Sequence, residues 1–200
     1  MTTHGIHVRG WAHRPARATA AETTTASAIT ALGASIAALR IGTGFVFLWA
    51  FLDKTFGWNY STPAANAWIH GGSPTKGFLA SVNAGPFASM FHSWAGQGWA
   101  DWLFMLALLG IGVALILGIG LRIAAVSGVV LVALMWAAVW PLAQHATGGA
   151  LTGSTNPLVD EHVMDALALI VVGAAGTASR LGLGALWAKL PFVQRHRVFL

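Results

Sequence analysis

The stretch from Trp102 to Ala143 decides the fold, and it reads WLFMLALLGIGVALILGIGLRIAAVSGVVLVALMWAAVWPLA. Arg122 is its one charged residue, and the flexible residues 118–122 divide it into two apolar runs, 102–121 and 123–143. Each run is close to the length of about 20 helical residues that crosses a hydrocarbon core. Because a backbone in lipid must satisfy its own hydrogen bonds, the stretch predicts a transmembrane helical hairpin.

The composition of the whole chain agrees with this prediction. The chain is 56% hydrophobic and 8% charged, with a mean hydropathy of +0.67, whereas a soluble domain carries about a quarter charged residues. So few charges exclude a soluble enzyme. Two further apolar runs, about 29–52 and 158–179, are long enough to span a membrane. We therefore predict an all-α polytopic membrane protein, an antiparallel four-transmembrane-helix bundle.

The predicted bundle occupies residues 29–180, between a basic cytoplasmic N-terminal tail, 1–28, and a basic cytoplasmic C-terminal segment, 181–200. Its long outer loop, 53–101, is rich in aromatic residues, glycine and proline. A solvated linker would not keep so many rings. We therefore expect short helices in the membrane interface, such as Pro63–His70 and Pro86–Trp94.

The charges predict how the bundle is oriented. In a four-span protein both termini and the 118–122 turn share a side, and that side holds eight of the eleven basic residues: Arg9, Arg14, Arg17, Arg122, Arg180, Lys189, Arg195 and Arg197. Five of the six acids lie on the other side or near it. The positive-inside rule then places both termini in the cytoplasm of a multi-pass protein of the bacterial plasma membrane. The net charge of +5 is then explained by a lipid bilayer as the partner. We expect no nucleic-acid partner.

Small residues one helical turn apart predict where the helices pack. They are Ala34, Ala38 and Gly42 in the first span, Gly110, Ala114 and Gly118 in the second, and Gly173 and Thr177 in the last. The chain has no cysteine, which excludes covalently attached c-type haem and thiolate-ligated Fe–S clusters.

Arg40 is the first candidate for a functional residue. It lies thirteen residues before Asp53, about 20 Å along a helix, and a charge at that depth needs a partner. Asp165, eight residues after Pro157, is the partner that we expect. The pair can act as a structural ion pair or as an anchor for a ligand or a proton relay.

The start of the last span is the second candidate. Glu161, His162 and Asp165 share one helical flank, and His145 lies just before the preceding connection. Such residues suit proton handling or a hard metal ion, although acids at a helix N-terminus also complement the helix dipole without forming a site. Our candidate catalytic residues are therefore Arg40, Asp165, His162 and Glu161, with no metal assigned.

The tryptophans cluster toward the outer ends of the spans, where an aromatic belt is expected. Trp49, Trp136 and Trp140 can also line a pocket for a flat ring, together with His145. We take these four as candidate cofactor-binding residues, and a quinone as the candidate cofactor.

The chain resembles the DoxX/DoxD-like family of small four-helix bacterial membrane proteins over about 39–192. The matching residues are Arg40-Ile41-Gly42 with Phe45, Trp49 and Lys54; Asp101-Trp102-Leu103-Phe104; Gly112 and 117–118 with Arg122; and Asn156-Pro157-Leu158 with Asp160-Glu161-His162. The resemblance implies a plasma-membrane protein. In the DoxD branch it implies a subunit of thiosulfate:quinone oxidoreductase, a thiosulfate dehydrogenase that passes electrons to quinone. It also implies a partner redox subunit, and a homo-oligomer is the other partner we consider.

A non-catalytic scaffold that docks partner enzymes in the membrane is the alternative function. Faces of small residues and structural ion pairs suit that role as well. A transporter is less favoured, because the sequence shows neither inverted repeats nor broken helices.

Overall fold

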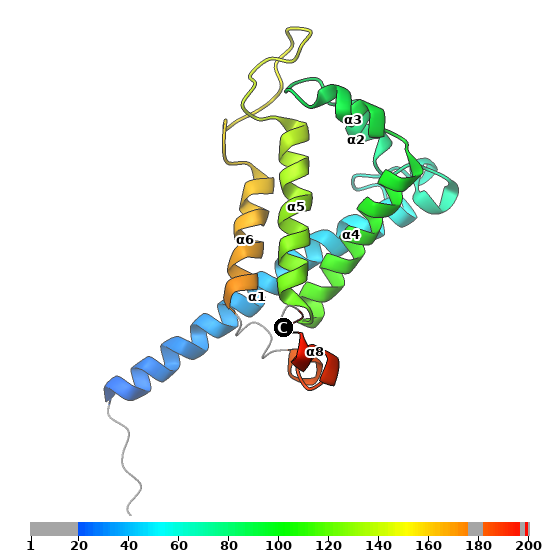
Figure 1. Ribbon diagram of the computed structural model, residues 1–200. Coiled ribbons are helices and arrows are strands. Elements are labelled where there is room, and N and C mark those ends of the chain that lie inside the picture. The colour runs from blue at the N-terminus through cyan, green and yellow to red at the C-terminus, as the bar shows by residue number, and fades with distance from the viewer. Residues whose placement is uncertain (1–19, 176–181, 197–198, 200) are drawn as a thin grey trace, which may run out of the picture. The chain divides into compact units, whose positions relative to one another are not determined.

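The computed structural model describes residues 20–175, 182–196 and 199, with side chains from residue 30 onward (Figure 1). The chain divides into two compact units, Met1–Leu32 and Gly33–Leu200, and the second holds every feature discussed below. Of the predicted N-terminal tail, residues 1–19 lie outside the described part, and residues 20–28 belong to the first helix.

The described chain is all-α. Four long helices are α1, Ala20–Phe56; α4, Gly98–Leu117; α5, Leu121–Val139; and α6, Glu161–Ala175. Two short α-helices and two 3₁₀ turns lie between α1 and α4: η1, Ala64–Asn66; η2, Trp68–His70; α2, Lys76–Ala80; and α3, Ala88–Trp94. The C-terminal segment contains α7, Gly184–Trp187, and α8, Pro191–Arg195. The predicted stretch Pro86–Trp94 contains α3, and the predicted stretch Pro63–His70 contains the two 3₁₀ turns. Their expected place in the membrane interface stays a prediction.

Among the residues that the structure describes, three helices are long and apolar enough to cross a membrane: Thr30–Phe56, Gly98–Leu117 and Leu121–Val139. They correspond to three of the four predicted spans. The fourth predicted span is not shown, because α6 has 15 residues, fewer than the 20 or so that a span needs. The end of that predicted span, 176–179, lies outside the described residues.

The helix pairs pack through glycines, but not through all of those predicted. An added Cβ at Gly112 would lie 2.7 Å from the backbone nitrogen of Leu48, and one at Gly44 would lie 2.8 Å from Cβ of Leu115. These contacts bring α1 against α4. By contrast, a Cβ at Gly42 or Gly110 would meet nothing within 4 Å, so these two predicted packing positions are wrong.

Helices α5 and α6 run antiparallel, side by side (Figure 1). Gly128 faces Leu169, and Gly173 faces Ala125, where an added Cβ would lie 2.7 Å from the Ala125 Cβ. Gly173 therefore packs as predicted. We name the two ends of the bundle from this arrangement: the Arg122 end, where α4 meets α5, and the loop end, where α1 ends and α4 begins.

The described chain returns to the Arg122 end after α6. At the loop end, the Trp136 indole donates a hydrogen bond to the carbonyl of Leu158 at 3.2 Å. At the Arg122 end, the backbone N–H of Leu183 donates to the carbonyl of Leu117 at 2.9 Å. The segment that carries α7 and α8 therefore lies at the opposite end of the bundle from the long loop.

The long loop is folded onto the loop end. Leu79, Val82 and Phe91 form a small apolar core with Ala138 of α5. Trp140 packs so closely on Gly85 that an added Cβ there would lie 2.5 Å from the indole. The α5 helix ends at Trp140 in a left-handed conformation, φ 49°, and the loop is held against that end.

Candidate functional site

Arg40 is buried, with 1% of its surface exposed, but it does not lie where the sequence places it. A Cβ added to Gly182 would lie 3.6 Å from the Arg40 guanidinium and 2.7 Å from the carbonyl oxygen of Leu117. The guanidinium is therefore at the Arg122 end, beside the last residue of α4. The sequence predicted that Arg40 is buried at mid-depth in the bundle, whereas the structure buries it beneath the C-terminal segment.

The predicted ion pair between Arg40 and Asp165 is not formed. Gly128 of α5 touches both Ile111 and Leu169, so these two residues are level with each other. Asp165 is four residues from Leu169 toward the loop end, and Leu117 is six residues from Ile111 toward the Arg122 end. At 1.5 Å per residue, about 15 Å of helix separates the levels of the two charges.

A different pair occupies the start of α6. The Asp160 carboxylate lies 2.8 Å from Nδ1 of His162 and accepts a second hydrogen bond from the backbone N–H of Val163 at 3.1 Å. Asp160 thus caps the helix and orients the imidazole at once. His162 is 7% exposed, so its ring is held in one place.

The surroundings keep the Asp160 carboxyl ionised. Burial alone would raise its pKa, but the hydrogen bonds from His162 and from the Val163 N–H together bring the pKa of Asp160 below its ordinary value. An ionised carboxylate accepts only, so Nδ1 of His162 carries the proton in this pair.

Glu161 is exposed beside this pair, and ligand atoms of Asp160, Glu161 and His162 lie within 4.8 Å of one another. Two acids at a helix N-terminus also complement the helix dipole. This group of possible ligands therefore differs from the predicted one, because it contains Asp160 in place of Asp165. His145 is an exposed residue paired with Leu151 in an isolated β-bridge, and it does not belong to this three-residue group.

The three candidate tryptophans divide between two clusters. Trp49 contacts Phe45, Trp58 and Tyr60, with ring centroids 5.0–5.7 Å apart. Trp136 and Trp140 are 5.9 Å apart, and Phe87 of the loop contacts Trp140. Among the ring contacts of the described residues, none joins Trp49 to the other pair, and a single pocket lined by all three tryptophans stays a prediction.

Sequence reasoning missed two buried carboxylates that hold the loop. Asp53 accepts hydrogen bonds from the Ser61 hydroxyl at 2.8 Å and the Ser61 N–H at 3.0 Å. Asp101 accepts from the hydroxyls of Ser73 and Thr75 and from the Thr75 N–H, at 2.6–3.0 Å. A possible sign in the sequence was the hydroxyl residues at 61–62, which closely follow Asp53, and at 73–75, which lie between Asp53 and Asp101.

Comparison with models of protein families, with curated proteins and with solved structures finds no match to this chain. The composition and the three apolar helices identify an integral membrane protein that associates with a lipid bilayer.

Proposed function

We propose that this chain is a quinone-linked redox subunit of the bacterial plasma membrane, as its resemblance to the DoxX/DoxD-like family implies. The observation that carries the proposal is the His162–Asp160 pair at the start of α6. A quinone site needs a proton-exchanging group beside an aromatic surface, near the membrane edge. The start of α6 offers both, because the Trp136 indole is bonded to Leu158, two residues before Asp160.

The residues fit a quinone only in part. Trp136 and Trp140 are half-buried and in ring contact, which suits a flat head group. One face of Trp140 is already covered by Gly85, so Trp136 is the ring that we expect a quinone to touch. Trp49, His145 and Arg40 belong to other parts of the molecule and take no part in this site.

The chemistry that a bound quinone supplies is uptake of two electrons and two protons on reduction to quinol. In the reaction that the resemblance implies, the electrons come from thiosulfate through a partner redox subunit. His162 would give up or take a proton at Nε2, and the ionised Asp160 would stabilise the imidazolium form. Glu161 is exposed at the same helix end and can pass protons between His162 and water.

A membrane topology belongs to this proposal. We propose four crossings, with α6 and the residues after it forming the fourth, and both termini in the cytoplasm. The support is the antiparallel packing of α6 on α5 and the return of Leu183 to the Arg122 end. The positive-inside rule then places the Arg122 end, with Lys189 and Arg195, in the cytoplasm.

Binding of a quinone analogue tests the site without any partner subunit. Decylubiquinone titrated into the purified protein should quench tryptophan fluorescence saturably in the wild type. The quenched fraction should fall in Trp136→Phe and persist in Trp49→Phe, since the two rings lie in different clusters. Equal loss in both variants, or no saturable quenching, contradicts the proposal.

Turnover with thiosulfate and a quinone tests the role of His162. His162→Gln should lower quinone reduction at least tenfold, while His70→Gln, an exposed histidine of the loop, should leave it unchanged. A wild-type protein that shows no reduction even with its co-purifying subunits would remove the enzyme function.

A scaffold that docks partner enzymes is the second candidate, and the folded loop favours it. Tyr60 is 76% exposed and Trp58 about half exposed, on a loop held by Asp53 and Asp101. Trp99 and Trp102, at the start of α4, are also about half exposed. Such a surface suits a protein partner or the headgroup region. In this case Trp58→Ala or Tyr60→Ala should lower the yield of a co-purifying complex without changing decylubiquinone binding.

A further inference from the structure

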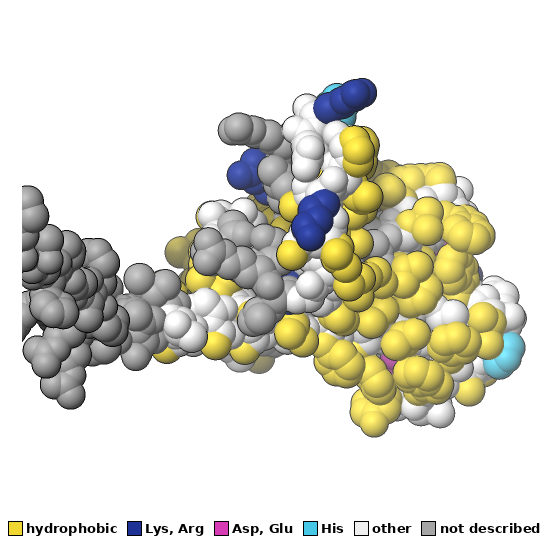
Figure 2. All heavy atoms as spheres, turned by 90° about the horizontal axis from the view of Figure 1, so that it is seen from below, with side chains coloured by type: hydrophobic (Ala, Val, Ile, Leu, Met, Phe, Trp, Pro, Cys, Tyr) yellow, Lys and Arg dark blue, Asp and Glu magenta, His cyan; other side chains and the backbone are white. Residues whose placement is uncertain are grey.

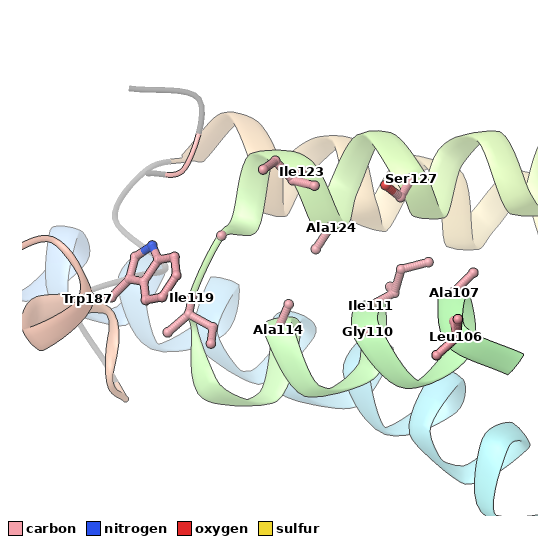
Figure 3. A pocket seen from close by; sticks show the side chains of 11 residues that line it. Leu106, Ala107, Gly110, Ile111, Ala114, Ile119, Ile123, Ala124, Ser127 and Trp187 are labelled. Carbon is pink, nitrogen blue, oxygen red and sulfur yellow. The ribbon is translucent and has the colours of Figure 1, made fainter. Parts of the chain in front are cut away.

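An open apolar groove runs between α4 and α5 (Figure 3). Its volume is about 330 Å³, at the lower end of the range for ligand pockets. Small residues make its walls, including Gly110 and Ala114 of α4 and Ala124 and Ser127 of α5. The Trp187 indole of α7 lies at the end of the groove near Ile119 (Figure 3).

The groove lies where one predicted packing residue, Gly110, meets no neighbour. Gly110 and Ala114 were expected to hold a neighbouring helix, but a Cβ added to Gly110 would meet nothing within 4 Å. The close contact of α4 with α1 is made instead by Gly112, on another side of the helix. The small residues thus leave a channel open along the bundle.

The end of the groove at Trp187 is basic. Arg122 adjoins Ile123, which lines the groove, and Lys189 follows Trp187 by two residues; both are exposed, as is Arg195. The sequence contains no Asp or Glu between 102 and 159 or after 165. Figure 2 shows Lys and Arg side chains gathered over this part of the molecule, beside a broad apolar face.

The C-terminal segment is also apolar where it is exposed. Four large apolar side chains of the segment are each 44–61% exposed: Leu183, Leu186, Leu190 and Phe192. The same segment carries the exposed cations Lys189 and Arg195. This mixture is typical of a segment that lies in the headgroup region of a bilayer. The Trp187 indole donates a hydrogen bond to the Phe199 carbonyl at 2.7 Å, which ties Trp187 to the end of this segment.

We propose that this groove is a binding site for an anionic phospholipid. One acyl chain lies along the small residues of α4 and α5, and the phosphate of the head group lies beside Lys189, Arg195 and Arg122. The basic charge at this end of the groove favours a lipid over a second copy of the chain. A second copy packed in parallel would bring two basic ends together, which repel, whereas an anionic head group is complementary to them.

Quenching by brominated lipid measures occupancy at Trp187 directly. The full-length protein is reconstituted in bilayers with increasing fractions of phosphatidylcholine brominated on its acyl chains, and the wild-type signal is compared with Trp187→Phe to isolate that ring. Unbrominated phosphatidylglycerol or phosphatidylcholine is then added as competitor. We expect phosphatidylglycerol to compete at least fivefold better, the effect of about one surface cation.

Charge variants test the head-group contact. Lys189→Gln should lower the preference for phosphatidylglycerol several-fold, and Lys76→Gln, an equal charge change in the loop, should leave it unchanged. Equal competition by the two lipids in the wild type, or equal effects of the two variants, overturns the proposal.

Glycine variants test the acyl-chain contact. Gly110→Leu fills the groove and should reduce quenching of Trp187, whereas Gly42→Leu, at an exposed glycine that is just as open on α1, should not. Circular dichroism of both variants checks that they are folded. If the brominated phosphatidylcholine does not quench Trp187 and cross-linking through the groove joins two copies, the groove is a protein interface and the lipid site is excluded.

Discussion

At the scale of the residue, buried carboxylates hold the long loop in place. Asp53 and Asp101 are both buried, yet each accepts several hydrogen bonds from hydroxyl and N–H groups of the long loop. A buried charge is tolerated only when it is satisfied in this way. Asp160 acts similarly on a smaller scale, since it holds both His162 and the first turn of α6.

Replacing Asp101 by alanine should release the loop. Asp101→Ala leaves the half-buried Ser73 hydroxyl and two buried donors of Thr75 without their acceptor, a loss of about 2–4 kcal/mol. We expect a lower thermal midpoint in detergent and faster chymotryptic cleavage at the loop aromatics. Glu161→Ala, which removes an exposed acid, is the control and should change both measurements little.

Acid should weaken the start of α6. Because the pKa of Asp160 is lower in the folded chain than its ordinary value, its contribution is fully present above the unfolded pKa of about 4. It is lost as the pH falls through the folded value. Asp160→Asn keeps a capping side chain but cannot titrate, so its thermal midpoint should fall less steeply than the wild type's below about pH 4. Parallel curves for the two proteins would contradict this assignment.

At the scale of the element, the position of a glycine on its helix decides what it does. Gly110 and Gly112 lie on the same helix, two residues apart, yet one faces an open groove and the other the backbone of α1. The sequence pattern of small residues selected Gly110, because spacing identifies a helical face but not which face meets a neighbour.

The two glycines give a matched pair of substitutions. Gly112→Ala puts a methyl group 2.7 Å from the Leu48 nitrogen, and since backbone cannot move aside, α1 and α4 must separate at a loss of about 1–3 kcal/mol. Gly110→Ala has room and gains up to about 1 kcal/mol of helix propensity. Unfolding in a titration with SDS should therefore move in opposite directions, and equal shifts would contradict the packing of α1 on α4.

At the scale of the whole molecule, the sequence predicted the helical class, three spans and the short helices of the loop. Those predictions depend on run length and aromatic content, which lipid constrains strongly. The sequence did not predict the position of Arg40 at the Arg122 end or the division of the tryptophans between two clusters. A depth counted along one helix ignores how far the neighbouring helices are shifted along their axes. For this reason the sequence paired Arg40 with Asp165, although about 15 Å of helix separates the levels of the two residues.

Labelling of introduced cysteines tests most directly the central claim, a membrane-crossing bundle with the long loop and the C-terminal segment on opposite faces. The chain has no cysteine of its own, so Ser81→Cys in the loop and Gln194→Cys in α8, both at exposed positions, report cleanly. In intact cells a membrane-impermeant maleimide should label the Ser81→Cys protein at once and the Gln194→Cys protein only after lysis. Labelling of both positions in intact cells would contradict the account.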